Sequence, residues 1–163
     1  MPKPRAGRRH WLFKTEPDVY SIEDLARERR TLWDGVRNYQ ARNLLRDDLQ
    51  LGDGVFIYHS SCERLGIAGL ATVTGVGIAD PSAFDPASPY HDPKSRPAAP
   101  TWYCVEIAFE RRFTPLIARD AIAAEPGLAA MVLLQRGSRL SIQPVGADEA
   151  RRLLQMAQHE AEA

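Results

Sequence analysis

Residues 33–43, WDGVRNYQARN, combine aromatic rings, amides and guanidinium groups around one glycine. Aromatic faces stack on flat rings, and Asn, Gln and Arg side chains hydrogen-bond to ring edges. A nucleobase offers both features, so this composition predicts a base-binding segment. A structural interpretation stands beside it, in which Trp33 packs in a core, Gly35 forms a turn and Asn38 caps a helix.

A pocket for an extruded base requires stacking surfaces, partners for the base edge and contacts for the phosphate. Trp33 and Trp102 are the candidate stacking residues, and core packing is the alternative for each. Tyr39 and Tyr58 are candidates to close the pocket, although Tyr58 also fits a buried strand. The Asn38 amide is the candidate for reading a base edge, a role compatible with capping a helix.

Small hydroxyl and cationic side chains complete the candidate set. Ser60 and Ser61 follow an apolar run and can face a cavity, with ordinary turn serines as the alternative. Lys14 stands at the end of another apolar run and can contact a phosphate or a base carbonyl. Three arginines are candidate phosphate ligands, with solvated or ion-paired surface positions as the alternative: Arg37, Arg42 and Arg139.

Two other function classes remain open. His59, Ser60, Ser61 and Cys62 place a base beside hydroxyls and a thiol, as a small hydrolase-type enzyme requires. Neighbouring strand residues point to opposite faces, so His59 and Ser60 are poorly placed to act together, and we predict no catalytic residues. The alternative is a protein-interaction module built on the proline-rich segment 80–100. Its six prolines are Pro81, Pro86, Pro89, Pro93, Pro97 and Pro100.

The composition limits how nucleic acid is held. The 163 residues fit one domain with a sizeable core, and the net charge is zero. A neutral chain is not held mainly by a broad cationic surface, so selectivity has to come from a pocket. Of the 21 basic residues 18 are Arg, which suits planar and phosphate recognition and also follows from GC-rich codon usage.

The remaining sequence features predict compartment and state. Cys62 and Cys104 lack metal-ligand spacing, so we expect free thiols, no metal and no cofactor. Residues 1–9 are basic without the apolar stretch of a signal peptide and are expected to form a disordered arm. No run reaches the length of a membrane span. We expect a cytoplasmic monomer with a single domain over residues 10–163 and no membrane contact.

The pattern of elements predicts the α+β class. Helix signals begin at Ser21, Asn38, Thr114, Leu128 and Asp148. Apolar and aromatic runs predict strands at 11–14, 31–33, 55–59, 65–79, 102–113 and 139–145. The strands do not alternate regularly with helices, and the glycines of 65–79 allow the bends of a barrel. We predict a small mixed or antiparallel β-barrel of five or six strands, flanked by helices.

Several motifs resemble the EVE domain family of the PUA-like superfamily. Residues 11–21, WLFKTEPDVYS, are similar to its opening motif, and residues 33–43 are similar to its WDGVRNYQARN signature. Later blocks follow in the same order: YHSS at 58–61, YHDPKS at 90–95, Trp102, and RLSIQPV at 139–145. The resemblance covers roughly residues 10–158 and departs at Ile142, where Val is common.

The resemblance implies a PUA-like fold and the binding of DNA or RNA through a modified base in an aromatic pocket. We therefore expect a nucleic-acid-binding module, without catalysis, that takes a flipped base. Its pocket is expected between residues 33–43, the end of the 55–59 strand and the start of the 102–113 strand. The 80–100 loop is expected to pack along one side of this pocket and help close it.

Overall fold

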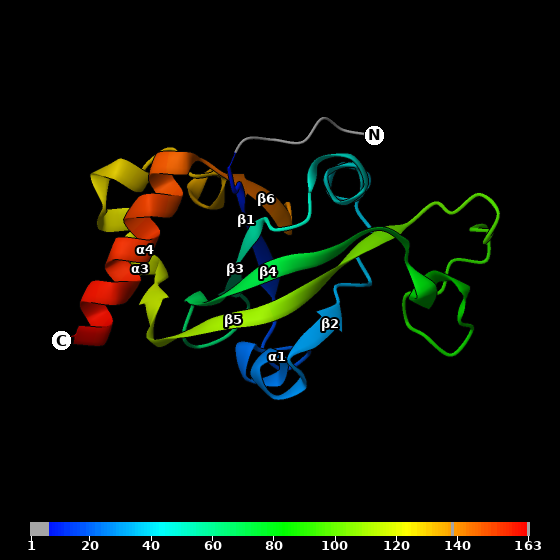
Figure 1. Cartoon of the computed structure of the whole chain (residues 1–163), viewed down its shortest axis with the longest axis horizontal. Coiled ribbons are helices and arrows are strands. Elements are labelled where there is room, and N and C mark those ends of the chain that lie inside the picture. Colours follow the sequence, from blue (N-terminus) through cyan, green and yellow to red (C-terminus); the bar gives the residue numbers. More distant parts are fainter. Residues whose placement is uncertain (1–6, 138, 163) are drawn as a thin grey trace.

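Six strands form one mixed sheet in the order β2-β5-β4-β3-β1-β6 (Figure 1). The computed structural model describes residues 7–137 and 139–162. The strands are β1 (His10–Thr15), β2 (Arg30–Leu32), β3 (Gly54–His59), β4 (Gly66–Ala79), β5 (Tyr103–Ala118) and β6 (Ile142–Val145). β1 runs parallel to β3, and all other neighbours are antiparallel. The α+β class and the six strands agree with the prediction.

The sheet is not closed, so the predicted β-barrel is wrong in this respect. Across the described residues, β2 pairs with β5 and β6 pairs with β1, and no ladder joins β2 to β6. β2 has three residues and β6 has four, so neither edge offers a long ladder to the other. The glycine-containing strand β4 does bend, as its shifts of register against β5 show.

Gly69, next to one of these register shifts, permits close packing against β4. A Cβ atom at this position would lie 2.5 Å from Ile22 Cδ1 and 2.6 Å from the Arg111 carbonyl oxygen. The start of helix α1 (Ile22–Glu28) therefore packs directly on the backbone of β4. Glycine is required here because only a residue without Cβ admits this approach.

The helices begin largely where their caps predict. Ser21 and Asp24 form a reciprocal capping box on α1. The Asn38 side chain accepts a hydrogen bond of 2.9 Å from Ala41 N and caps α2 (Tyr39–Asn43), which continues as a π-helical turn over Leu44–Asp48. The chain adds α3 (Arg119–Ala124), α4 (Ala147–Glu162) and short 3₁₀ turns at Pro81–Phe84, Pro126–Leu128 and Val132–Leu134.

The helix predicted to begin at Thr114 and Pro115 is wrong. β5 continues through both residues to Ala118, and the helix α3 starts only at Arg119. The local signal was a cap residue followed by proline. Pairing with β4 overrides it, because Ile117 and Ala118 still lie opposite the first residues of β4.

Two hydrophobic cores cover opposite faces of the sheet. Ile57 belongs to the core that includes Leu25 of α1, whereas its neighbour Phe56 belongs to the core that includes Ile122 of α3 and Leu153 of α4. This alternation follows from the period of two along a strand. In Figure 1, α1 lies below the strands, and α3 and α4 lie together at the left of the view.

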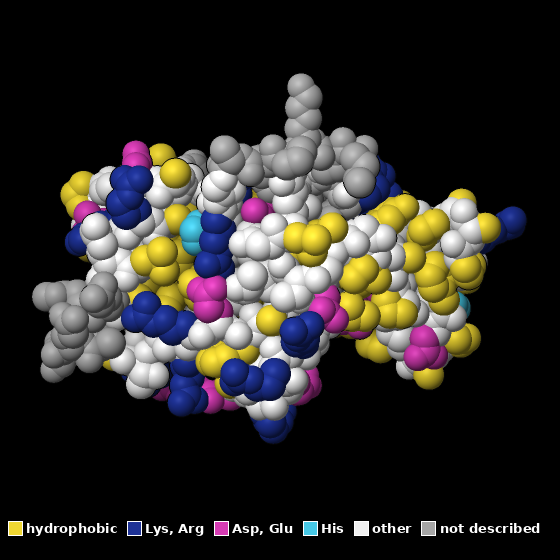
Figure 2. Space-filling model, in the orientation of Figure 1, with side chains coloured by type: hydrophobic (Ala, Val, Ile, Leu, Met, Phe, Trp, Pro, Cys, Tyr) yellow, Lys and Arg dark blue, Asp and Glu magenta, His cyan; other side chains and the backbone are white. Residues whose placement is uncertain are grey.

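The segment between β4 and β5 projects beyond the sheet (Figure 1). It carries the six prolines and only one short 3₁₀ turn, as the sequence predicts. Figure 2 shows hydrophobic side chains gathered over this projection, at the right of the view. We call residues 80–100 the projecting segment.

Candidate functional site

A cavity of about 480 Å³ lies where β1 ends beside the chain between β2 and α2. This volume falls within the range of about 300–1,000 Å³ that is typical of small-ligand pockets. The lining residues are Lys14, Thr15, Glu16, Val19, Tyr20, Thr31, Leu32, Trp33, Asp34, Gly35, Val36, Arg37, Tyr90 and Ser141. Among the predicted site residues, Lys14, Trp33 and Arg37 therefore share this cavity.

Trp33 is the largest aromatic side chain among the lining residues, and core aromatic rings fix its orientation. The indole is 9% exposed and belongs to the first core. Phe13 lies at 5.4 Å between ring centroids, and Tyr20 meets the indole edge-on at 5.9 Å. Trp33 is therefore both a core residue and a lining residue, because the same ring packs inward and borders the cavity.

Tyr20 is a neutral hydrogen-bond donor in this wall. Burial is the main cause that raises the pKa of its phenol to about 12. Its hydroxyl donates a hydrogen bond of 2.9 Å to Glu28 Oε1. The signal that could have found Tyr20 is Pro17, which breaks the chain directly after an aromatic strand and turns the following residues back toward it.

Asp80 ties the cavity wall to the projecting segment. Its carboxylate is fully buried and accepts hydrogen bonds from Gly35 N at 2.8 Å, Arg37 Nη1 at 2.9 Å and Ser82 N at 2.8 Å. Burial tends to raise the pKa of Asp80, but the hydrogen bonds from Ser82, Arg37 and Gly35 outweigh it and hold the pKa below its usual range. Asp80 therefore stays ionised, and its charge joins the segment at Gly35 and Arg37 to the start of the projecting segment.

Arg37 is engaged within the protein. Besides Asp80, its guanidinium donates to the Tyr90 carbonyl oxygen at 2.6 and 3.1 Å and to Ser82 Oγ at 3.2 Å. The side chain is 23% exposed. This geometry corresponds to the ion-paired alternative for Arg37 rather than to a free phosphate ligand.

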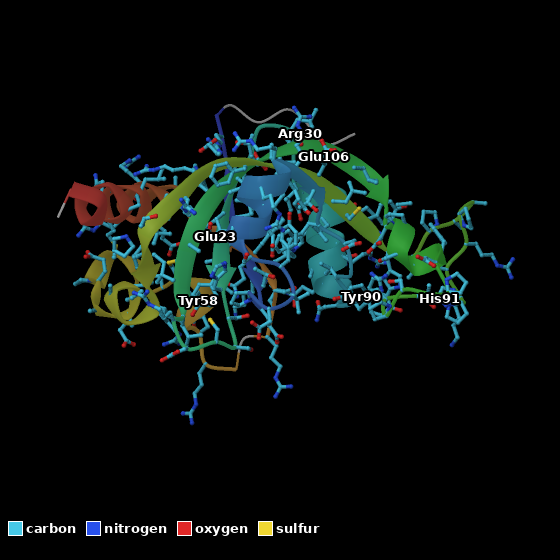
Figure 3. All side chains as sticks on the ribbon, turned by 90° about the horizontal axis from the view of Figure 1, so that it is seen from below. Glu23, Arg30, Tyr58, Tyr90, His91 and Glu106 are labelled. Carbon is cyan, nitrogen blue, oxygen red and sulfur yellow. The ribbon has the colours of Figure 1, made fainter. Side chains whose placement is uncertain are left out.

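Gly35 allows the projecting segment to close on the wall. Its φ is +80°, and a Cβ atom there would lie 2.7 Å from the Tyr90 ring. Both facts favour glycine, because the left-handed conformation strains other residues and the ring leaves no space. Tyr90 consequently lines the cavity from the far side, and Figure 3 shows it at the base of the projecting segment, away from Tyr58.

Trp102 and Tyr39 lie outside the lining of the cavity. Their rings stack at 5.0 Å, with Arg42 at 5.0 Å over Tyr39 and Arg37 at 5.1 Å over Trp102. The Trp102 indole donates a hydrogen bond of 2.8 Å to Asp92 in the projecting segment. Trp102 is buried and Tyr39 is 62% exposed, so this stack runs from the surface to the back of the cavity wall.

Three further candidates lie behind or beside the cavity. The Ser60 backbone N–H donates a hydrogen bond of 2.8 Å to the carbonyl oxygen of Thr15. Thr15 lines the cavity, whereas Ser60 does not. Ser61 is exposed with φ of 52°, and Tyr58 is 3% exposed within the second core. The cavity is formed mainly by β1 and residues 31–37, and Tyr58, Ser60, Ser61 and Trp102 do not line it, so their contacts with a ligand stay predictions.

The remaining cationic candidates are placed at the surface. Arg139 is exposed and stands two residues before Ser141, whose carbonyl oxygen accepts from Lys14 N at 2.9 Å. Arg42 donates to the Thr101 carbonyl oxygen at 2.9 Å and covers Tyr39. Asn38 is exposed, and its side-chain oxygen is occupied by the cap. Their contacts with a ligand remain predictions.

Three charged residues that line the cavity have no partner side chain within the described residues: Lys14, Asp34 and the exposed Glu16. Over the described residues, neither Lys14 nor Asp34 forms a side-chain hydrogen bond or ion pair with another residue. Burial, and then the charge of Asp80, raises the pKa of Asp34. Burial, and then the charge of Arg119, lowers the pKa of Lys14. Lys14 is half-buried and Asp34 is exposed, so a donor and an acceptor at the lining of the cavity are open to a ligand of complementary polarity.

His59 is committed to the fold. Its Nε2 accepts a hydrogen bond of 3.1 Å from Ile22 N at the start of α1, and burial lowers the pKa of its imidazole. The ring nitrogen that would serve as a base is therefore occupied by a backbone donor. Cys62 and Cys104 are free thiols, and within residues 7–137 and 139–162 no three His, Cys, Asp or Glu side chains gather at a metal-binding distance.

The described part of the N-terminal arm contacts the sheet. Arg8 forms an ion pair of 3.0 Å with Glu110, and the Arg9 guanidinium lies 4.7 Å over the Trp11 ring. Residues 1–6 of the predicted arm lie outside the described residues. No helix in the described chain has the length and apolar character needed to cross a membrane.

Comparison with known proteins gives consistent matches over nearly the whole chain. Residues 9–156 match the family described as EVE domain. The sequence is 42% identical to Thymocyte nuclear protein 1 from Homo sapiens, over 86% of this chain and 70% of the relative. The relative of the same name from Danio rerio is 39% identical over 90% of this chain and 70% of its own length.

Solved structures show the same similarity. A crystal structure of a protein from Pseudomonas syringae has a TM-score of 0.87 at 42% identity, covering 91% of this chain and 99% of that one. The crystal structure of the human THYN1 protein in complex with 5-methylcytosine-containing DNA has a TM-score of 0.84 at 38% identity. It covers 92% of this chain and 98% of that one.

Proposed function

Because this chain belongs to the EVE domain family, we propose that it is a DNA-binding module that recognises a modified base flipped into the cavity beside Trp33. The relative crystallised with 5-methylcytosine-containing DNA supports DNA as the partner and a modified cytosine as the base. The observation that carries the proposal is the cavity itself. It joins a fixed indole face to a free donor, Lys14, and a free acceptor, Asp34.

The net charge of zero determines how much of the affinity comes from the base pocket and how much from contacts with the DNA phosphates. A neutral protein gains little from the phosphate field as a whole, so few phosphate contacts contribute. One stacked base contributes about 1–3 kcal/mol. Binding of an oligonucleotide is therefore of moderate strength, and the pocket supplies most of the preference for one base over another.

The proposed role is recognition and not catalysis. His59 accepts from a backbone N–H and caps α1, so it is not available to activate Ser60, Ser61 or Cys62. We also retain RNA carrying the same base, a monomeric state and a cytoplasmic location as predictions. The curated relatives bear the word nuclear in their name, which concerns those proteins.

The projecting segment supports a second candidate function. Hydrophobic side chains gather on its surface in Figure 2, and its prolines limit its unfolded freedom. A protein partner that docks on this surface would make the chain an interaction module. Contacts of Tyr90 and Arg37 with the cavity wall favour the first candidate, because they place the base of the segment at the pocket.

The test is a titration of labelled duplex and single-stranded DNA carrying cytosine, 5-methylcytosine or 5-hydroxymethylcytosine at one position, with RNA of the same sequence in parallel. We expect tighter binding to a modified base than to cytosine. Equal and negligible binding to all probes would overturn the proposal. Binding that depends on salt but not on the base would reduce the protein to a phosphate binder without a base pocket.

A further inference from the structure

Asp34 is the only carboxylate on the 31–37 wall of the cavity, and its backbone is held on both sides. Its own N–H donates to the Leu32 carbonyl oxygen at 3.0 Å, and the next residue, Gly35, donates to Asp80 at 2.8 Å. Within the described chain, its carboxylate takes part in no hydrogen bond with another residue. The backbone that carries this exposed carboxylate is thus held in place, while the carboxylate itself is bound by no other described residue.

We propose that Asp34 makes the pocket selective for pyrimidines with a 4-amino group and excludes those with a 4-oxo group. The proposal rests on the proposed function, which supplies a pyrimidine as the flipped base. A carboxylate only accepts hydrogen bonds. The exocyclic amino group of cytosine and its 5-substituted forms donates, so it pairs with Asp34. The O4 atom of thymine or uracil is also an acceptor, so it forms no hydrogen bond with the carboxylate and is repelled by it.

Lys14 completes the same edge with opposite polarity. Lys14 is one of the residues that line the cavity, and its ammonium group only donates hydrogen bonds, so it suits the acceptor atoms O2 and N3 of cytosine. The two groups together match an edge with one donor and adjacent acceptors. A site that hydrogen-bonds a particular group rejects the analogue lacking it far more strongly than an apolar pocket rejects a missing methyl group.

The comparison of 5-methylcytosine with thymine isolates this contact. Both rings carry the 5-methyl group and the same stacking surface. They differ at position 4, and in the proton that thymine carries on N3. Any preference between them therefore reports the hydrogen-bonding edge and not the aromatic wall or the methyl group.

The experiment measures binding of two duplexes that place 5-methylcytosine or thymine opposite an abasic site. Neither base then breaks a Watson–Crick pair on flipping, so the comparison is free of pairing energy. The wild-type chain is expected to bind the 5-methylcytosine duplex about tenfold more tightly. In Asp34→Asn, the amide can donate to O4, so the ratio is expected to fall to about twofold or less.

Asp18→Asn is the matched control. Asp18 is exposed in the turn that carries the lining residue Val19, but it does not line the cavity. Removing this charge is expected to change affinity for both duplexes equally and to leave their ratio intact. Thermal unfolding verifies that Asp34→Asn folds, and because burial and Asp80 disfavour the charged form of Asp34, the amide is expected to be tolerated.

The outcomes separate the two proposals. A wild-type ratio near one, or a ratio that survives in Asp34→Asn, overturns the role of Asp34 while base binding itself stands. Loss of preference in Asp18→Asn as well would assign the effect to charge near the rim and would also overturn it. Wild-type protein that binds neither duplex more tightly than one with two abasic positions overturns the proposed function and this inference together.

Discussion

The two tryptophans that the sequence places in one pocket serve two different regions. Trp33 borders the cavity and packs on Phe13 and Tyr20. Trp102 is absent from the lining, donates a hydrogen bond to Asp92, and contacts the Tyr39 ring and the Arg37 guanidinium. We call the first region the Trp33 wall and the second the Trp102 stack. The Trp33 wall borders the cavity, whereas the Trp102 stack ties the projecting segment to the rest of the chain.

The charged groups of the two regions differ in whether they have partners within the protein. Asp92 and Arg37 in and beside the Trp102 stack have their charges paired with protein donors or acceptors. Lys14 and Asp34 on the side of the Trp33 wall face the cavity and have no partner side chain within the described residues. Lys14 is half-buried and Asp34 is exposed, so their hydrogen-bonding capacity is not taken up by the fold. Unused hydrogen-bonding capacity thus distinguishes a recognition surface from a scaffold of similar composition.

The largest effect is expected from Asp80, which joins the two regions. Asp80→Asn leaves the partly buried Arg37 guanidinium without its counter-charge and is expected to lower the free energy of unfolding by about 3 kcal/mol or more. Thermal or denaturant unfolding measures it. Asp148→Asn in the exposed ion pair with Arg151 is the control and should change stability little.

The effect of Asp80→Asn on the free energy of unfolding is expected to depend on pH. The hydrogen bonds lower the folded-state pKa of Asp80, so its contribution is complete above the unfolded pKa of about 3.9 and is lost as pH falls through the folded value. The stability difference between wild type and Asp80→Asn is therefore expected to narrow below about pH 4. A constant difference from pH 7 to pH 3 would show that the ion pair with Arg37 is not its source.

The second prediction separates the two tryptophans. Trp33→Leu and Trp102→Leu each remove a buried indole, and each is expected to lower the free energy of unfolding by about 2 kcal/mol or more. Only Trp33→Leu removes a stacking face, so it should weaken binding of the modified base about tenfold or more, against about threefold or less for Trp102→Leu. Calorimetry at a temperature where both variants are folded provides the comparison. Equal binding losses would mean that the stack, too, belongs to the recognition surface.

The sequence predicted the fold better than the cavity, and particular residues explain why. The Asn38 cap and the Ser21 capping box are local, so three neighbouring residues define them. Pro115 gave a false helix start because pairing between β4 and β5 decides that region from far along the chain. The cavity likewise depends on β1 meeting residues 31–37, a long-range contact that no spacing reveals. Trp102 has the chemistry of a base reader, and only its hydrogen bond to Asp92 shows its other use.

The third prediction tests how the projecting segment supports the wall. Replacing residues 88–94 with a Gly/Ser linker removes the Tyr90 ring and loosens the carbonyl oxygen that holds Arg37. Affinity for the modified base is expected to fall about threefold to tenfold, because ordering the linker costs entropy on binding, while the sheet stays folded by circular dichroism. The same replacement at residues 96–99, which do not line the cavity, is expected to leave affinity unchanged. Unchanged affinity in both variants would show that the projecting segment does not support the cavity wall in base binding.

The smallest effect concerns phosphate contacts, where Arg139 and Arg37 differ. Arg37 is occupied by Asp80 and Tyr90, whereas Arg139 is exposed two residues from Ser141 at the cavity. A single phosphate contact contributes about 0.9 to the slope of log affinity against log salt on duplex DNA. Arg139→Gln is therefore expected to reduce that slope by about one and to weaken all probes by the same factor, with the preference for the modified base unchanged. Arg151→Gln on α4, whose partner is Asp148, is the matched control and should leave the slope as it is. A change of base preference in Arg139→Gln would instead place this arginine at the base edge and extend the recognition surface beyond the Trp33 wall.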